Sequence, residues 1–307
     1  MSITLDTPLS SRVGQKLVPI ARLGVRHMPA CKLRYALWKQ FSWRRHDFIA
    51  RTQFGSIISG DTRDLIQRYI YYFGIWEPHL TAWISRRLGG DRLFVDVGAN
   101  IGYFTLLGSH LLANGGRVVA IEASRKIYSQ LLRNLELNGC KNVRSQCAAA
   151  TAERCKVTLY ESDGTNLGSS TMVPGVLHRP TCSEVEGLPL SDMLAPEEVE
   201  RIRLIKIDVE GAEWDVLVGM HRILPMLPKD AELVVEISPQ ILAIQKRSAA
   251  DILNIFRDAG FYPYLLVNQY EPEAYLFPGE ISAPQRHYGP ITRPTDVVFS
   301  RVDAKYL

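Results

Sequence analysis

Carboxylates and glycines stand at the ends of apolar runs, where they could bind a ligand. The stretch FVDVGANIGYFT (94–105) carries four such residues between a predicted strand and a predicted helix: Asp96, Gly98, Asn100 and Gly102. Glycine lets the backbone approach a ligand closely, and asparagine tolerates a turn conformation while offering a polar side chain. The pattern G-x-N-x-G differs from the dinucleotide fingerprint G-x-G-x-x-G, so a pyrophosphate is not the expected ligand.

A second apolar run, RVVAIE (117–122), ends in an acidic residue. Glu122 follows Gly98 by 24 residues. At the tip of a second parallel strand, such a side chain can accept hydrogen bonds from both hydroxyls of a ribose. Gly98 and Glu122 together therefore predict a site for a ribose-containing ligand. The alternative is a glycine turn beside a solvated glutamate.

Three further acids follow apolar runs later in the chain. Asp208 and Glu210 come after IRLIKI (202–207), and Glu236 ends LVVE. Parallel strands end at the same edge of a sheet, so we expect these carboxylates to line one crevice. They could serve as a general base, as acceptors for substrate hydroxyls or as ligands of a hard cation. Asp208 is the expected base, with a pKa raised by burial, and Glu210 and Glu236 are the expected orienting acids.

These side chains are positioned by a regular alternation of predicted strands and helices from Arg92 onward. The strands are expected at 92–97, 117–122, 142–147, 203–208, 232–237, 262–267 and 295–300, and the helices at 102–113, 124–137, 212–223 and 248–259. This alternation predicts an α/β fold, with a mostly parallel sheet and helices on both faces. The segment 158–191 is predicted to be a hairpin and a long loop that contacts the acceptor, and His178 in it could enter the site.

Residues 1–90 are expected to form an extension before a catalytic domain at 91–307. The extension is predicted to contain a hairpin around 54–60 and two helices. Gly89 and Gly90 are expected to end the second helix with a left-handed cap.

The start of the chain is strongly basic. Residues 1–51 hold ten Lys and Arg against two Asp, although the net charge of the whole chain is only +4. Aromatic residues interleave with these charges in KLRYALWKQFSWRRHDF (32–48), a composition suited to peripheral contact with an anionic membrane surface. The alternative is a helical extension that packs its aromatic side chains on the main domain and leaves its charges in water.

Composition limits the remaining possibilities. The five cysteines are scattered without a C-x-x-C pair, so neither a disulfide framework nor a zinc site is expected. No apolar run reaches the length of a membrane-spanning helix. We expect a cytoplasmic protein, in solution or in peripheral contact with a membrane.

Three of these stretches resemble a known family. FVDVGANIGYFT, the strand end at Glu122 and above all IKIDVEGAE (205–213) resemble the FkbM family of S-adenosylmethionine-dependent methyltransferases. The likeness covers roughly residues 50–300 and includes FGSIISGD and FGIWEP, which resemble the segment before the catalytic domain there. It implies a class I, Rossmann-like fold with a seven-stranded sheet and S-adenosylmethionine as cofactor. It also implies O-methylation of a hydroxyl on a sugar, glycolipid or polyketide-like acceptor.

The resemblance also implies roles for individual residues. The cofactor loop would contain Asp96, Gly98, Ala99, Asn100 and Gly102. Glu122 would bind the ribose, and Asp208 with Glu210 would match the motif after the fourth strand. One departure is QCAAAT, which lacks the acidic or amide residue common near the adenine after the third strand. Adenine contact would then come from the backbone and small side chains around Cys147 and Ala148.

Two other functions are compatible with a cofactor pocket of this kind. N-methylation of a nucleic-acid base needs an acid or amide followed by prolines and an aromatic ring that holds the flipped base. Here the fourth strand is followed by DVEG, with neither proline nor ring, so no nucleic-acid partner is expected. The second alternative is a membrane-docked module that binds S-adenosylmethionine without turnover.

Overall fold

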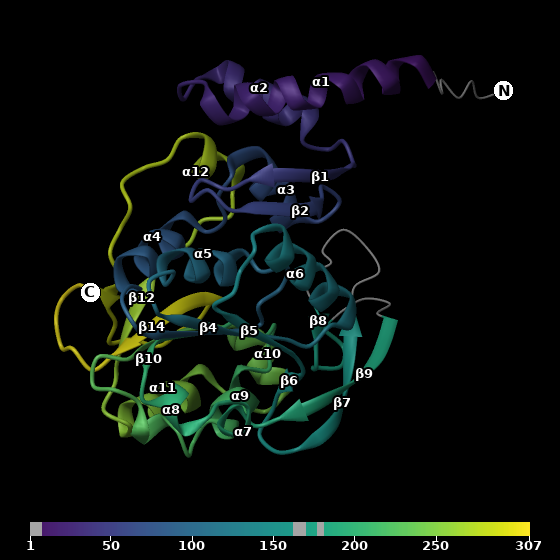
Figure 1. Cartoon of the computed structure of the whole chain (residues 1–307). Coiled ribbons are helices and arrows are strands. Elements are labelled where there is room, and N and C mark those ends of the chain that lie inside the picture. The colour runs from purple at the N-terminus through teal and green to yellow at the C-terminus, as the bar shows by residue number, and fades with distance from the viewer. Residues whose placement is uncertain (1–7, 162–169, 177–180) are drawn as a thin grey trace.

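An eight-stranded sheet forms the centre of the protein (Figure 1). The computed structural model describes residues 8–161, 170–176 and 181–307. From edge to edge the strands follow the order β13 (Gln285–Arg286), β12 (Tyr262–Leu266), β14 (Thr295–Ser300), β11 (Glu232–Ile237), β10 (Ile202–Ile207), β3 (Leu93–Val97), β4 (Arg117–Glu122) and β5 (Val143–Cys147).

The direction of these strands defines the fold. The five strands from β11 to β5 run parallel, whereas β14 runs antiparallel to both of its neighbours, β11 and β12. This is the arrangement of a class I methyltransferase, so the predicted fold is confirmed. The two-residue strand β13 is added at one edge, beyond the seven strands predicted.

Alternate side chains of the strands enter two separate hydrophobic cores. On β3, Phe94 belongs to the core under α4 (Pro78–Arg87), α5 (Tyr103–Leu111) and α6 (Arg125–Leu137). Its neighbour Val95 belongs to the second core, together with residues of α9 (Glu213–Gly219) and α11 (Ala249–Asp258), helices that lie on the opposite face of the sheet (Figure 1). Burial on both faces explains why the strand sequences are continuously apolar. The helical elements of the second face and the C-terminal region are α7 (Leu190–Met193), α8 (Pro196–Val199), α9 (Glu213–Gly219), the 3-10 helix η1 (Leu224–Met226), α10 (Pro239–Ile244), α11 (Ala249–Asp258) and α12 (Pro272–Leu276).

Local signals explain where α3 (Leu65–Phe73) and α4 begin and end. The Asp64 side chain caps α3 by accepting a hydrogen bond from the backbone N–H of Gln67 at 2.9 Å, and Gly74 ends the helix in the left-handed region with φ 72°. The predicted left-handed cap of α4 is wrong. The cap residue of the helix is Leu88, which has an extended backbone and a buried side chain. Gly90 has a positive φ, but it lies two residues beyond this cap.

A smaller sheet follows β5 along the chain. Its order is β6 (Ala149–Ala150), β9 (Thr181–Leu188), β7 (Cys155–Glu161) and β8 (Ser170–Thr171). β7 and β9 pair antiparallel along the whole length of β7. Within the segment 158–191, predicted as a hairpin and a long loop, residues 158–161, 170–171 and 181–188 are strand. On β7 the apolar Val157 and Leu159 alternate with Lys156 and Thr158, and Leu159 is the side chain that is fully buried. His178 lies outside the described residues.

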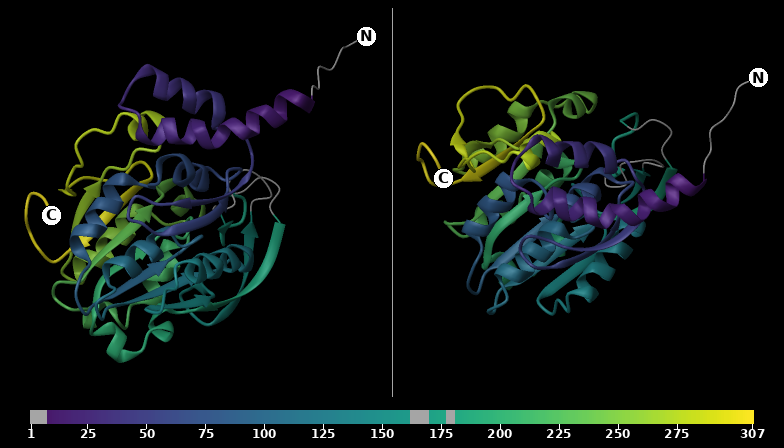
Figure 2. Two further views of the ribbon diagram at one scale, coloured as in Figure 1. Left: turned by 45° about the horizontal axis from the view of Figure 1, so that its top comes forward. Right: turned by 90° about the horizontal axis from the view of Figure 1, so that it is seen from above.

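The N-terminal extension packs over the α3 side of the molecule. It consists of α1 (Pro8–His27), α2 (Lys32–Phe41), and a hairpin of β1 (Asp47–Arg51) and β2 (Ile57–Asp61), close to the predicted hairpin (Figures 1 and 2). Val25 and Trp38 are buried, and the Arg22 Nε donates to the carbonyl oxygen of Tyr71 at 2.7 Å.

These contacts support the prediction that the extension packs on the main domain. One hydrophobic core contains residues from both sides of position 90, and the division into 1–90 and 91–307 stays a prediction. Membrane contact also stays a prediction. In the described part of the chain, no helix is both long and apolar enough to span a bilayer.

Candidate active site

The loop between β3 and α5 brings the backbone close to the loop after β10. Gly98 has φ 78°, and a Cβ at this position would lie 1.8 Å from the backbone oxygen of Asp208. Asn100 and Gly102 also have positive φ, of 51° and 93°. All three predicted loop residues therefore have a left-handed backbone, which favours glycine or asparagine, and Gly98 also has no room for a Cβ.

Glu122 anchors this loop from the end of β4. Its Oε2 accepts a hydrogen bond from the Asn100 N–H at 2.9 Å, and its Oε1 accepts one from the Ser124 N–H at 2.8 Å. Each oxygen keeps a further lone pair for a ligand hydroxyl. Burial raises the pKa of Glu122 to about 7. The carboxylate is thus oriented by the backbone and close to the point of ionisation at neutral pH.

A narrow cavity of about 70 Å³ lies against this loop. Its walls include four residues of the predicted cofactor site and two of the predicted catalytic acids: Gly98, Asn100, Glu122, Ala148, Asp208 and Glu210. Met172 and Ser170 close the cavity from the smaller sheet. Ligand pockets commonly measure about 300 Å³ or more, so binding of a nucleoside-sized ligand requires side chains such as Met172 to move.

Asp96, Ala99 and Gly102 contribute to the site from outside this cavity lining. Asp96 is fully buried, and its Oδ2 accepts a hydrogen bond from Thr105 Oγ1 at 2.5 Å. Its Oδ1 has no hydrogen-bond partner in the described structure. Ala99 is buried, and Gly102 begins α5, where a Cβ would lie 2.5 Å from Leu131. These positions shape the loop, and Asp96 retains a free acceptor.

Lys206 brings a positive charge into the carboxylate crevice. Its Nζ lies 2.8 Å from Asp208 Oδ2 and 5.2 Å from the centre of the Phe104 ring, and its side chain is 5% exposed. Burial alone would lower its pKa, but the attraction of nearby carboxylates, Asp208 foremost, outweighs burial and raises the pKa above its usual value. The ammonium is charged over the whole physiological pH range.

The expected raised pKa of Asp208 is wrong. Burial acts to raise it, but the Lys206 ammonium and a hydrogen bond from Glu236 outweigh burial and hold the pKa below its usual value. Asp208 is therefore ionised at neutral pH and a weak proton acceptor. The sequence-based expectation considered burial of Asp208 without the cation that neighbours it.

The other two predicted acids take up protons more readily. Repulsion by Asp208, reinforced by burial, raises the pKa of Glu236 to about 12, so Glu236 is neutral and donates a hydrogen bond to Asp208. Burial and repulsion by Asp208 raise the pKa of Glu210 to about 8. Glu210 has φ 53°, and its backbone oxygen accepts a hydrogen bond from Thr171 Oγ1 at 2.7 Å. One crevice thus contains three carboxyl groups in different protonation states.

Sequence reasoning missed four polar residues that adjoin this crevice. Asp296 on β14 lies opposite Glu236 in the sheet, and burial raises its pKa to about 7. Its Oδ2 accepts a hydrogen bond from Asn268 Nδ2 at 2.5 Å. Glu77 is buried with φ 42°, and its Oε1 accepts a hydrogen bond from the Tyr270 hydroxyl at 3.0 Å.

Lys206 was also missed, although the sequence holds a signal for it. A lysine inside the apolar run IRLIKI is unusual because a buried lysine needs a partner. We refer to Lys206, Asp208, Asp96, Glu77, Glu236 and Asp296 as the lysine–carboxylate cluster. Among the residues that the structure describes, no group of three or more His, Cys, Asp or Glu has an arrangement that could hold a metal ion.

The sheet order and this crevice at the carboxyl ends of the strands define a class I methyltransferase. Comparison with known proteins gives the same class: the model of the methyltransferase FkbM domain matches residues 96–263, which is more than half of the chain. The chain belongs to the FkbM methyltransferase family.

Two curated relatives are similar over part of the chain. Methyltransferase 1 from Beauveria bassiana (strain ARSEF 2860) is 31% identical over 147 residues, which are 42% of this chain and 59% of that protein. Methyltransferase sdnD from Sordaria araneosa is 32% identical over 187 residues, which are 50% of this chain and 70% of that protein. The chain thus spans less than two thirds of the length of the first relative.

Among solved structures, methyltransferase FkbM from Methylobacillus flagellatus KT is similar with a TM-score of 0.42 and 16% identity. The match covers 93% of this chain and 60% of that one. A putative methyltransferase from Streptococcus mutans in complex with SAH matches with a TM-score of 0.41 and 14% identity. It covers 73% of this chain and 97% of that one.

Proposed function

We propose that this protein transfers the methyl group of S-adenosylmethionine to a hydroxyl oxygen of a sugar, glycolipid or polyketide-like acceptor. The observation that carries this proposal is the lysine–carboxylate cluster beside the glycine loop and Glu122. The site contains more carboxyl groups than cations, which favours a cationic ligand. Burial raises the pKa values of Glu122 and Glu210, and repulsion by neighbouring carboxylates such as Asp208 adds to the rise.

The residues present fit this cofactor. Glu122 has lone pairs for the two ribose hydroxyls, Gly98 leaves room for close approach to the backbone, and Ala148 offers a small apolar wall for the adenine. When bound, S-adenosylmethionine supplies a methyl group on a positively charged sulfur. The cluster would then lie beside this positive charge.

The chain's own residues have to orient an acceptor hydroxyl and take its proton. We assign the proton to a carboxylate oxygen of Glu210, because a base is most effective when its pKa is close to the working pH. Asp208 is a weaker base and is fixed by the ammonium of Lys206. Asp208 and the neutral Glu236 would orient the acceptor by hydrogen bonds. Such base assistance contributes a factor of about 10² to 10⁴ in rate.

The pH dependence of methyl transfer tests this division of roles. A carboxyl base works only when deprotonated, so the rate should rise as the pH rises through about 8, the pKa of Glu210. Glu210→Gln should lose this rising limb while still binding the cofactor. If Asp208 were the base, the rate of the wild type would already be level well below neutral pH, and the Glu210 assignment would fail.

The acceptor class is tested by transfer of labelled methyl from S-adenosylmethionine into fractionated cell extracts. We expect label in glycan, glycolipid or polyketide-like fractions, in base-stable ether linkage. Label confined to nucleic acid would favour N-methylation of a base. Tight cofactor binding with no label in any fraction would favour a binding module without turnover. If EDTA abolished activity and Mg²⁺ restored it, a bound metal ion would acidify the acceptor hydroxyl, and the assignment of Glu210 as the base would fail.

A further inference from the structure

A second and larger cavity lies between the β1–β2 hairpin and α6. Its volume is about 810 Å³, within the range of sites for small ligands. We call it the hairpin groove; its inner wall is formed by Phe48, Ser59, Gly60, Gln67, Ile101 and Ile127. None of the predicted site residues lines it.

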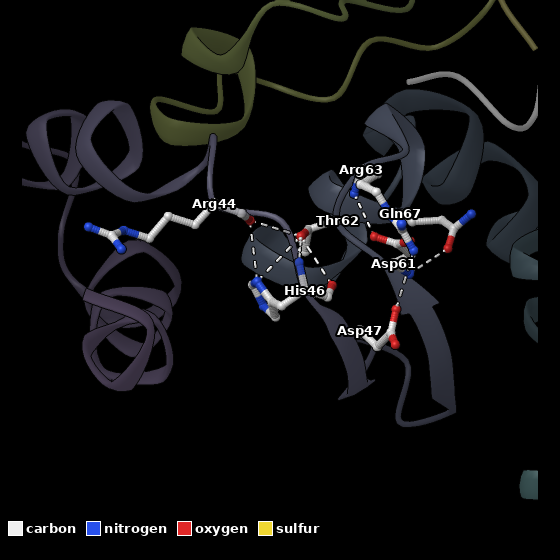
Figure 3. Close-up of polar contacts among 7 residues, drawn as sticks. All are labelled: Arg44, His46, Asp47, Asp61, Thr62, Arg63 and Gln67. Carbon is white, nitrogen blue, oxygen red and sulfur yellow. Dashed lines mark hydrogen bonds and ion pairs between the residues drawn. The ribbon is translucent and has the colours of Figure 1, made fainter. Parts of the chain in front are cut away.

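The inner wall presents two polar groups without partners. Gln67 is only 5% exposed, and its Oε1 accepts a hydrogen bond from the Asp61 N–H at 2.8 Å. Its Nε2 donates no hydrogen bond within the described ranges, and Figure 3 shows this nitrogen turned away from Asp61. Ser59 is 7% exposed, and its hydroxyl is likewise without a partner there. Donors on the wall of a groove can pair with acceptor oxygens of a ligand that enters it.

The rim of the groove is positively charged. Arg45, Lys126 and Arg133 line it and are exposed, and none forms an ion pair with another described residue. Arg63 also lines the groove, but it pairs with Asp61 and lies 3.8 Å from Asp47 (Figure 3). The two acids of the rim are therefore occupied by one arginine, and three cations remain for an anionic group.

The backbone around Arg45 is held in place. Thr62 Oγ1 donates to the carbonyl oxygen of Arg44 at 2.9 Å and accepts from the His46 N–H at 2.9 Å (Figure 3). The Thr62 N–H donates to the carbonyl oxygen of His46 at 3.0 Å. Arg45 thus extends from a segment tied on both sides to the end of β2. The backbone of Arg45 is therefore fixed at the rim, while its exposed side chain can move to reach a ligand.

The hairpin groove and the cofactor cavity are lined by neighbouring residues of the chain at two places. Ile101 lines the groove and directly follows Asn100 of the cofactor cavity, while Gln67 of the groove directly follows Ile66 of that cavity. An extended acceptor could therefore have one part in the groove and another near the cofactor loop.

We propose that the hairpin groove binds a phosphate-bearing saccharide portion of the acceptor. The hydroxyls of the sugar would pair with Gln67 and Ser59, its apolar face would contact Phe48, and the phosphate would meet Arg45, Lys126 and Arg133. That the ligand is the methyl acceptor rests on the proposed function. Binding itself can be measured without turnover.

Calorimetric titration of the full chain with glucose 1-phosphate tests the groove. The double variant Lys126→Ala/Arg133→Ala should bind this probe roughly twofold to thirtyfold more weakly, as expected for loss of two exposed charge contacts. The matched control is Arg222→Ala/Lys229→Ala, which removes two exposed cations that do not line the groove. Gln67→Glu keeps the oxygen that accepts from Asp61 but replaces the free donor, and it should also weaken binding. Circular dichroism verifies the fold of each variant.

Unlabelled glucose and inorganic phosphate separate the two parts of the ligand. Weak binding of both, with tight binding of glucose 1-phosphate that only the groove variants reduce, supports the proposal. Phosphate bound as tightly as glucose 1-phosphate overturns the saccharide part. No binding of glucose 1-phosphate, or equal loss in the control variant, overturns the whole. Titration of S-adenosylmethionine into the same variants should be unchanged, so failure of the groove and failure of the cofactor site are distinguishable.

Discussion

Replacing Lys206 by methionine should destabilise the protein in a pH-dependent way. Methionine is similar in length but has no charge, so Lys206→Met leaves Asp208 without the ammonium now 2.8 Å away. Removing one partner of a buried ion pair costs about 3 to 5 kcal/mol. The side chain of Asp208 is 33% exposed, and solvent therefore screens part of this penalty. We expect a loss of about 3 kcal/mol in the free energy of unfolding at about pH 7.5.

The pH window follows from the two shifted pKa values. The pKa of Asp208 is lower in the folded protein, so its contribution to stability is present above its unfolded pKa of about 4 and is lost as the pH falls through the folded pKa. The pKa of Lys206 is raised on folding, so its contribution is present below its unfolded pKa of about 10.4 and is lost only as the pH rises through the folded pKa. Without the ammonium, burial raises the pKa of Asp208 in the Lys206→Met variant, so the variant protonates Asp208 at a higher pH than the wild type does. The deficit of Lys206→Met should therefore be largest near neutral pH and shrink as the pH falls towards about 4.

Urea denaturation followed by circular dichroism measures this difference. Wild type and Lys206→Met are compared at about pH 7.5 and at about pH 4. Lys229→Met serves as a control because Lys229 is exposed, and its effect should stay within about 0.5 kcal/mol. A deficit for Lys206→Met below about 1 kcal/mol, or one of equal size at both pH values, would refute the assignment of Lys206 as the counterion of a buried acidic crevice.

Two further changes have direct outcomes. Gly98→Ala should lower the melting temperature and reduce the free energy of unfolding by about 2 kcal/mol or more, because the new Cβ would lie 1.8 Å from the Asp208 backbone oxygen and φ is 78°. A melting temperature equal to that of the control Gly89→Ala would contradict this prediction. If the exposed side chains of α1 contact an anionic membrane, Ile20→Ser/Leu23→Ser should reduce cosedimentation with anionic vesicles, and wild-type binding should fall with salt; equal sedimentation of both proteins would leave α1 as a packing element.

The central strands β3, β4, β10 and β11 were predictable because each is a short, mainly apolar run that is buried on both faces. Gly98 and Gly102 were also predictable as loop residues, since their positive φ values and the absence of space for a Cβ select glycine directly. The strand β7 was predictable in part, because Val157 and Leu159 alternate with Lys156 and Thr158 and a hairpin is expected from position 158.

The protonation states of the site could not be predicted from single positions. The pKa of Asp208 depends on Lys206 two residues earlier and on Glu236 from the neighbouring strand. Glu77 reaches the crevice from the N-terminal extension, far from Asp208 in the sequence. The sequence identifies the strand ends, whereas the balance of burial against charge depends on which of them meet in space.

Binding of S-adenosylmethionine is the decisive measurement, made by titration calorimetry with wild type and Glu122→Ala. The substitution removes the acceptor expected to bind both ribose hydroxyls, so affinity should fall by about 1.5 to 3 kcal/mol. Wild-type affinity should itself weaken as the pH falls below about 7, where Glu122 becomes protonated. The exposed Glu153→Ala is the matched control and should bind as wild type does. Equal affinity of wild type and Glu122→Ala, or no binding by either, would contradict the assignment of this pocket to S-adenosylmethionine.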